Sequence, residues 1–184
     1  MHNLDVTATD AINSLAGLYG PLDALMITMT YFGVPSMVLW VALQWWLGAE
    51  PKLPRRHVIV SAGLTFLLGL LINQVVLLFV HRMRPYDAGL TSLLIPATSD
   101  PSFPSDHATA SFAIALTFLM KGFRLKGLWL GLVAIVVCIS RVYVGMHYVT
   151  DVIGGMLTAF VACLLVGWLY RAGSFVDTRL TRLL

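Results

Sequence analysis

Two histidines stand beside polar residues in a chain that is otherwise strongly apolar. His107 lies in the stretch FPSDH and His147 in GMHYVTD. Imidazole acts as a nucleophile, acid or base near neutral pH, so both side chains are candidates for catalysis. His147 precedes Asp151 by four residues. If a helix begins there, both lie on one face, the carboxylate accepts from one ring nitrogen, and the other nitrogen faces outward. A polar pair at a water-facing helix end is the alternative.

Two arginines near the ends of apolar runs could form an anion site. Arg141 lies within a run where an unpaired charge costs about 2.5 to 3.5 kcal/mol at the middle of a membrane. A structural ion pair with Asp106 or Asp151 would also satisfy it. Arg84, before Pro85, ends the second run, where a lone arginine is usually an interfacial anchor. Two guanidinium groups converging from different helices suit the oxygens of a phosphoryl group.

The start of the third apolar run adds a further anion-binding element. Ser105 precedes His107 by two residues, and a helix beginning there presents unpaired N–H groups and a hydroxyl to an anion. A serine in this position also commonly just caps the helix. The histidines and aspartates lack H-x-x-x-H or C-x-x-C spacing, so a metal site is a minor alternative and we expect no metal or other cofactor.

Composition identifies the class of protein. Of the 184 residues, 58% are hydrophobic and 11% charged, and the mean hydropathy is +0.83, which excludes a soluble domain of this size. The net charge of +3 comes from basic residues dispersed between apolar runs, so nucleic acid is not an expected partner. No linker or internal repeat divides the chain, and we expect one domain over residues 1–184.

The apolar runs predict an all-α integral membrane protein, a bundle of about five transmembrane helices with a short N-terminal interfacial helix. The expected spans lie near residues 23–47, 57–80, 105–121, 127–146 and 149–171, with 1–21 as the interfacial segment. The third span is short unless it includes the PSDH residues. We therefore expect His107 to lie below the membrane surface.

Basic residues predict the orientation. Nine of the twelve lie between or after the spans on one side: Lys52, Arg55, Arg56, Lys121, Arg124, Lys126, Arg171, Arg179 and Arg182. By the positive-inside rule this side, with the C terminus, is cytoplasmic, and the N terminus and the loop 81–104 are outside. The other three basic residues, Arg82, Arg84 and Arg141, share the outer side with both histidines.

These motifs resemble those of the type 2 phosphatidic acid phosphatases, membrane relatives of the vanadium haloperoxidases. That family carries Lys-x6-Arg-Pro, Pro-Ser-Gly-His and Ser-Arg-x5-His-x3-Asp. This chain has RP at 84–85, PSDH at 104–107 and SRVYVGMHYVTD at 140–151. The resemblance covers roughly the C-terminal two thirds of the chain, and the third motif is complete.

The chain departs from the family pattern at two positions. Leu77 stands where the family has its lysine, and Asp106 stands where it has glycine. Because the first change removes a phosphate-binding cation, we expect Arg82 or His81 to take over part of that role. Both changes together resemble the undecaprenyl pyrophosphate phosphatase branch.

The resemblance implies a role for each matching residue. His147 would attack phosphorus to form a phosphohistidine, Asp151 would hold its ring, and His107 would protonate the leaving oxygen and then activate water. The residues expected to bind substrate are Arg84, Arg141, Ser105, Arg82 and Asp106. The family needs no metal.

We therefore expect a phosphatase in a bacterial inner membrane that removes the terminal phosphate of undecaprenyl pyrophosphate at the outer face, in support of peptidoglycan synthesis. Its partners would be the lipid substrate and the bilayer. One alternative is another lipid phosphate: phosphatidylglycerol phosphate, phosphatidate or a lipid A phosphate. The other is a non-catalytic anion-binding protein or transporter, although paired broken helices in two repeated halves are lacking. Oligomeric state leaves no signal in the sequence.

Overall fold

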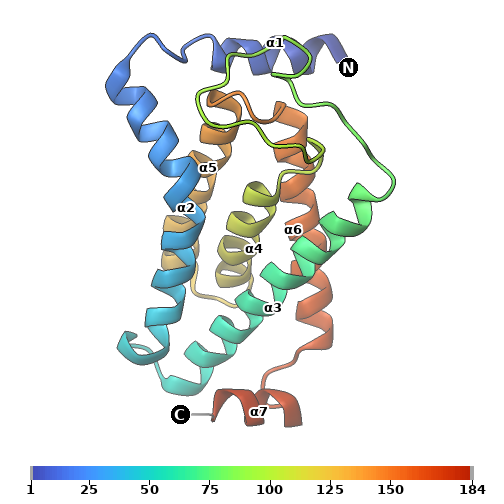
Figure 1. Cartoon of the computed structure of the whole chain (residues 1–184). Helices are drawn as coiled ribbons and strands as arrows, with labels where there is room; N and C mark the ends of the chain where they lie inside the picture. The colour runs from blue at the N-terminus through green and yellow to red at the C-terminus, as the bar shows by residue number, and fades with distance from the viewer. Residues whose placement is uncertain (1, 183–184) are drawn as a thin grey trace.

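A computed structural model describes residues 2–182 of the chain, and every regular element within them is a helix (Figure 1). The helices are α1 (His2–Asn13), α2 (Gly20–Leu47), α3 (Lys52–Leu77), α4 (Asp106–Met120), α5 (Arg124–Tyr143), α6 (Val149–Leu169) and α7 (Phe175–Thr181). The predicted all-α bundle with a short N-terminal helix is confirmed. α7 was not predicted.

Helices α2, α3, α5 and α6 are each long and apolar enough to cross a membrane. The fifth core helix, α4, has only 15 residues, about 22 Å at 1.5 Å per residue, against a hydrocarbon core of about 30 Å. It packs against α3, α5 and α6 and lies at the centre of the bundle (Figure 1). Its first turn lies deeper than the neighbouring ends of α5 and α6, so His107 is recessed.

Some helix ends differ from the predicted spans for identifiable reasons. α2 begins at Gly20, three residues early, because Pro21 in its first turn has the φ angle of a helix and needs no N–H partner. α5 ends at Tyr143, since Gly145 turns the chain with a φ of +82°. α3 ends at Leu77, and the predicted residues 78–80 continue as a turn.

Close contact between α4 and α6 positions the first turns of both helices. A Cβ atom on Gly155 would lie 2.5 Å from the carbonyl oxygen of Ser105 and 2.9 Å from Cβ of Ala108. The hydroxyl of Thr109 donates to the Gly155 carbonyl oxygen over 3.0 Å. Glycine is thus required for the two backbones to approach at this depth.

The α1 helix lies across one end of the bundle, together with the connection from α3 to α4 (Figure 1). Asp5, Thr9 and Asn13 are buried at intervals of four residues, so one polar face of α1 is turned toward the bundle. Leu4 is 76% exposed. A short helix is present within the segment predicted to be interfacial, and its buried face is polar. We call this end of the bundle the α1 end and the opposite one the α7 end.

Candidate active site

A pocket of about 640 Å³ opens at the α1 end and is lined by residues from four helices and two connecting segments. Its charged and titratable lining residues include Arg84, Asp106, His107, Arg141 and His147. The sequence predicted all five as site residues, although they come from parts of the chain up to 63 residues apart. The two imidazoles and two guanidinium groups thus share one cavity.

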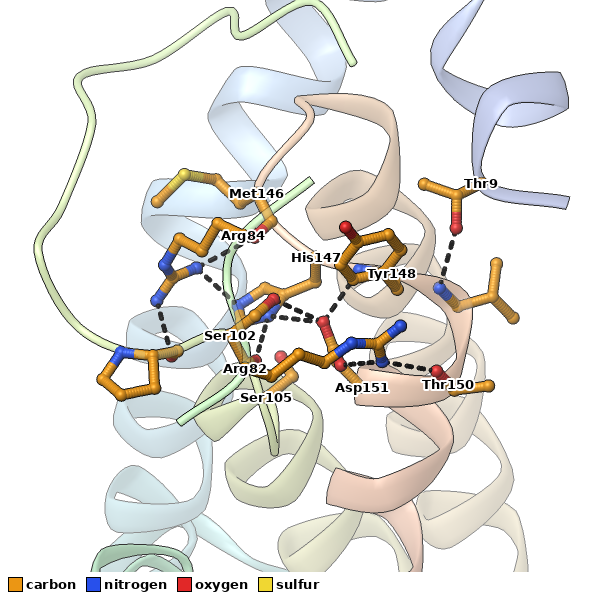
Figure 2. A network of polar contacts seen from close by, with 12 residues as sticks. Thr9, Arg82, Arg84, Ser102, Ser105, Met146, His147, Tyr148, Thr150 and Asp151 are labelled. Carbon is orange, nitrogen blue, oxygen red and sulfur yellow. Dashed lines mark hydrogen bonds and ion pairs between the residues drawn. The ribbon is translucent and has the colours of Figure 1, made fainter. Parts of the chain in front are cut away.

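His147 lies in this pocket with only 4% of its surface exposed. Its Nδ1 atom is 2.8 Å from the carbonyl oxygen of Ser102, to which it donates, and its Nε2 atom is 3.4 Å from Nη1 of Arg84 (Figure 2). Because Nδ1 donates, Nε2 carries the lone pair, which faces Arg84 on the pocket side of the ring. Burial, followed by the charges of Arg141 and Arg84, lowers the pKa of His147 to about 4, so the ring is neutral at pH 7.

The expected direct hydrogen bond between His147 and Asp151 is replaced by a bridge through Ser102. The carboxylate oxygen Oδ2 is 3.7 Å from Nδ1 of His147, farther than the Ser102 carbonyl. It accepts instead from the Ser102 hydroxyl at 2.5 Å and from the backbone N–H of Tyr148 at 2.9 Å. Ser102 therefore contacts both residues, with its carbonyl on the imidazole and its hydroxyl on the carboxylate. Ser102 has no place in the predicted site, because it lies in an irregular segment where spacing predicts no shared face.

Besides its contact with His147, Arg84 is held in place by three backbone carbonyl groups. Nε donates to Asp100 at 2.8 Å, Nη1 to Met146 at 2.9 Å and Nη2 to Pro101 at 3.3 Å. Burial lowers the pKa of Arg84, which starts so high that the group is still charged at neutral pH. Carbonyl groups fix its orientation without neutralising it.

Arg141 and Ser105 each keep a buried polar atom without a hydrogen-bond partner. Arg141 is 5% exposed and Ser105 is fully buried, and the unpartnered atoms are Nε and Oγ. Ser105 precedes α4 and makes no capping hydrogen bond with its side chain, so the capping alternative is not observed. Within residues 2–182, no carboxylate oxygen lies within 4.0 Å of Arg84 or Arg141. The alternative in which Asp106 or Asp151 pairs with Arg141 is therefore not observed either. Buried groups of this kind are typical of a site built for a polar ligand.

Arg82 and His81, which were expected to take over part of the role of the family lysine, are both absent from the pocket lining. The guanidinium of Arg82 donates to Oδ1 of Asp151 and to Oδ2 of Asp5, each at 2.6 Å, and lies 3.8 Å over the ring of Tyr148. Although burial opposes the charge, these acidic partners raise the pKa of Arg82. Two carboxylates bind Arg82, which does not line the pocket, whereas Leu77 does.

The α1 helix supplies polar partners for the start of α6, which no sequence motif indicates. The Asp5 carboxylate accepts from the backbone N–H and the hydroxyl of Thr150 at 3.0 and 2.6 Å. Thr9 accepts from the N–H of Val149 at 3.1 Å. A helix start leaves such N–H groups unpaired, so α1 completes the first turn of α6. The four-residue spacing of polar residues in α1 was the available signal.

Asn13 fixes the connection from α3 to α4 to the end of α5. Its side-chain amide donates to the carbonyl oxygens of Ser92 and Tyr143 at 2.9 and 2.8 Å, and its oxygen accepts from the N–H of Ser92 at 2.7 Å. All the hydrogen-bonding groups of this side chain except one lone pair are used. α1 therefore holds two segments that carry pocket residues, the connection from α3 to α4 and the end of α5.

Asp106 is oriented by Asn73, a fully buried residue of α3. The Asn73 amide donates to Oδ1 of Asp106 at 2.7 Å and to the hydroxyl of Thr109 at 2.9 Å. The carboxylate and the adjacent His107 both line the pocket. Among residues 2–182 there is no cluster of three or more His, Cys, Asp or Glu side chains that could hold a metal ion.

Comparison with known proteins gives consistent matches. Residues 58–174 match the PAP2 superfamily. The chain is 33% identical over 160 residues to undecaprenyl-diphosphatase BcrC of Bacillus subtilis, covering 87% of this chain and 79% of that one. It is 31% identical to the putative undecaprenyl-diphosphatase YbjG of Escherichia coli, covering 74% and 65% of the two chains. Among solved structures, the transmembrane PAP2 type phosphatidylglycerolphosphate phosphatase from Bacillus subtilis matches with a TM-score of 0.63 and 27% identity over 89% and 84% of the two chains.

Proposed function

The chain belongs to the PAP2 superfamily and is a multi-pass membrane lipid phosphatase, and we propose that it removes the terminal phosphate of undecaprenyl pyrophosphate. One observation carries the proposal: His107, His147, Arg84 and Arg141 line a single pocket at the α1 end. The substrate comes from the relatives, two of which carry the name undecaprenyl-diphosphatase.

In the proposed first step, Nε2 of His147 attacks the terminal phosphorus as the bond from phosphorus to the bridging oxygen breaks. His107 donates a proton to that oxygen, and undecaprenyl phosphate leaves. In the second step a water molecule attacks the phosphohistidine and gives its proton to His107. The phosphorus–nitrogen bond breaks and inorganic phosphate is released, which returns both histidines to their starting state. No metal or cofactor takes part in these steps.

Arg84, Arg141 and Ser105 are proposed to bind the oxygens of the transferred phosphoryl group. The Arg84 side chain is already fixed by three carbonyl groups, so little reorganisation is needed when charge develops on the oxygens. The unpartnered Nε of Arg141 and Oγ of Ser105 are donors without another use. Asp106 would accept a hydrogen bond from a protonated oxygen of the substrate phosphate.

Apolar residues of the pocket provide the place for the lipid end of the substrate. Tyr31 of α2 and Leu77 of α3 line the pocket beside the charged residues, and both helices are membrane spans. A substrate could thus keep its hydrocarbon chain in the bilayer while its phosphates reach His147. Leu77 suits such a wall better than the lysine of the family pattern would.

We propose that the α1 end faces the outside of a bacterial inner membrane and that the C terminus is cytoplasmic. The support is the charge distribution. The connection from α2 to α3, the turn from α4 to α5 and the tail with α7 lie at the opposite end (Figure 1). Nine of the twelve basic residues lie in these segments or in the first two turns of α3 and α5, which follow them, and the positive-inside rule places this end in the cytoplasm.

Another lipid phosphate is the second candidate substrate, favoured by the match to a phosphatidylglycerolphosphate phosphatase. Phosphate release by the purified protein should be measured with undecaprenyl pyrophosphate, phosphatidylglycerol phosphate, phosphatidate and a lipid A phosphate. We expect the highest kcat/KM with undecaprenyl pyrophosphate. A clearly higher value with any other lipid would replace our choice of substrate while leaving the mechanism in place.

A further inference from the structure

A second cavity, of about 570 Å³, lies at the α7 end, at the opposite end of the bundle from the catalytic pocket. It is enclosed by the start of α3, the turn from α4 to α5, the end of α6 and α7. None of the residues assigned to hydrolysis contributes to it. Its lining combines cations, one buried carboxylate and an apolar wall.

The buried carboxylate of Asp177 is fully engaged by its neighbours. Oδ1 accepts from Nδ1 of His57 at 2.8 Å and from the hydroxyl of Tyr170 at 2.5 Å, and Oδ2 accepts from the N–H of Gly173 at 2.7 Å. Although burial opposes ionisation, these hydrogen bonds lower the pKa of Asp177. The carboxylate is therefore charged and has little capacity left for another cation.

The same network fixes the orientation of His57. The imidazole stacks on the ring of Tyr170 with centroids 5.0 Å apart and planes 15° apart, and its Nδ1 is used by Asp177. The side chain lines the cavity and is only 7% exposed. Nε2 is left as the ring nitrogen that can serve a ligand there.

Three further cations surround the cavity: Lys121, Arg171 and Arg182. Within residues 2–182, none of them lies within 4.0 Å of a carboxylate oxygen. By contrast, Lys126 at the same end forms an ion pair, with its ammonium group 2.8 Å from the Glu50 carboxylate. In the described part of the chain these three cations have no carboxylate partner within 4.0 Å, which favours an anionic ligand.

The remaining wall is apolar and lies at the ends of α3 and α6, two helices long and apolar enough to span a membrane. Leu53, Pro54 and Phe123 line the cavity, and the nearby Trp168 at the end of α6 is 67% exposed. Tryptophan at the end of a membrane span commonly lies at the level of lipid headgroups. A ligand that fits both walls carries a phosphate and a hydrocarbon chain.

We propose that this cavity binds the phosphate-bearing headgroup of an anionic membrane lipid, with Lys121, Arg171 and Arg182 around the phosphate and the acyl chains along the apolar wall. Free inorganic phosphate offers the same charge and oxygens. The lipid is the better fit because inorganic phosphate would leave Leu53, which is 54% exposed, without an apolar partner.

The test uses the purified full chain and measures the midpoint of thermal unfolding with added phosphatidylglycerol, phosphatidylcholine or inorganic phosphate. The test variant carries Lys121→Gln, Arg171→Gln and Arg182→Gln. The matched control carries Lys52→Gln, Arg124→Gln and Arg179→Gln, which removes the same charge at the same end from residues that do not line the cavity. We expect only phosphatidylglycerol to raise the midpoint of the wild type and the control, and the shift to be lost in the test variant.

A single Lys121→Gln variant keeps the proposal testable if the triple variant does not fold, with an expected loss of phosphatidylglycerol affinity of about tenfold. An equal response to inorganic phosphate would overturn the lipid assignment, and an equal loss in the control would show a general surface-charge effect and overturn the site. Lipid hydrolysis should stay at the wild-type rate in all three variants, since the catalytic pocket is at the other end. The outcome is therefore separate from that of the proposed function.

Discussion

Arg82 donates from Nη1 to Oδ1 of Asp151 at 2.6 Å, using the carboxylate oxygen that does not face His147. The Arg82 side chain is 26% exposed, whereas the Asp151 side chain is fully buried. Arg82 thus compensates the buried negative charge of Asp151 from the side of the carboxylate opposite His147. Through its second nitrogen Arg82 also binds Asp5, so the N-terminal helix is electrostatically connected to the residue that flanks the proposed nucleophile.

This connection predicts that Asp5→Asn lowers hydrolysis although Asp5 is outside the pocket. Asparagine has the size of aspartate but no negative charge, so residue 5 no longer forms an ion pair with Arg82. The guanidinium then interacts more strongly with the Asp151 carboxylate. We expect kcat to fall about tenfold with little change in KM, which corresponds to roughly 1.4 kcal/mol. The control is Asp10→Asn, on the exposed face of the same helix. Equal losses in both variants would contradict a specific role for Asp5.

Replacement of the two histidines should have different consequences. We expect His147→Ala to abolish phosphate release, because in the proposed mechanism the bond to phosphorus forms at Nε2 of His147. His107→Ala should lower kcat by about 10² to 10⁴, the usual contribution of a general acid. Phosphate release by purified protein measures both. Undiminished turnover in His147→Ala would refute the phosphohistidine mechanism.

The pH dependence of hydrolysis should reflect the environment of His147. The attacking ring must be neutral, and burial together with Arg141 and Arg84 lowers the pKa of His147 to about 4. Activity should therefore persist as the pH falls through the ordinary histidine range and be lost only as the pH approaches 4. The acid limb of kcat/KM measures this. In Arg84→Gln, which removes one of these charges, the limb should move to higher pH, whatever the absolute rate. A limb near pH 6.5 in the wild type would contradict the assignment.

Gly155→Ala should damage both stability and activity. Its Cβ would lie 2.5 Å from the Ser105 carbonyl oxygen, so α4 would have to move away from α6 and carry His107 with it. We expect a loss of about 1 to 3 kcal/mol in the free energy of unfolding and a lower kcat. The control is Gly131→Ala, whose Cβ would meet no atom within 4 Å. If the two variants behaved alike, the close approach of the helices would be unimportant for the site.

Chelation should leave hydrolysis unchanged, since the proposed steps use cationic side chains where many phosphatases use metal ions. The measurement is the rate of phosphate release before and after treatment with EDTA. A loss of activity that is restored only by a divalent cation would show that a metal takes part.

The five core helices and the lining of the pocket were predictable for simple reasons. Apolar runs of membrane-spanning length define the helices, and the residues near their ends meet because the bundle is short. Arg82 was misassigned because it stands two residues from Arg84 in sequence, whereas Asp5 and Asp151 determine where it lies. Asp5 is 77 residues from Arg82, and no local pattern reports a contact over that distance.

The contact of the Ser102 carbonyl group with His147 has a consequence for the newly synthesised protein. Ser102 belongs to the connection from α3 to α4, and its carbonyl is the group that orients the ring of His147. A newly synthesised chain whose helices are already in the bilayer has every reactive side chain, yet its nucleophile has no fixed direction until that connection has folded onto the bundle. On the proposed mechanism, hydrolysis therefore requires the folded connection as well as the inserted helices.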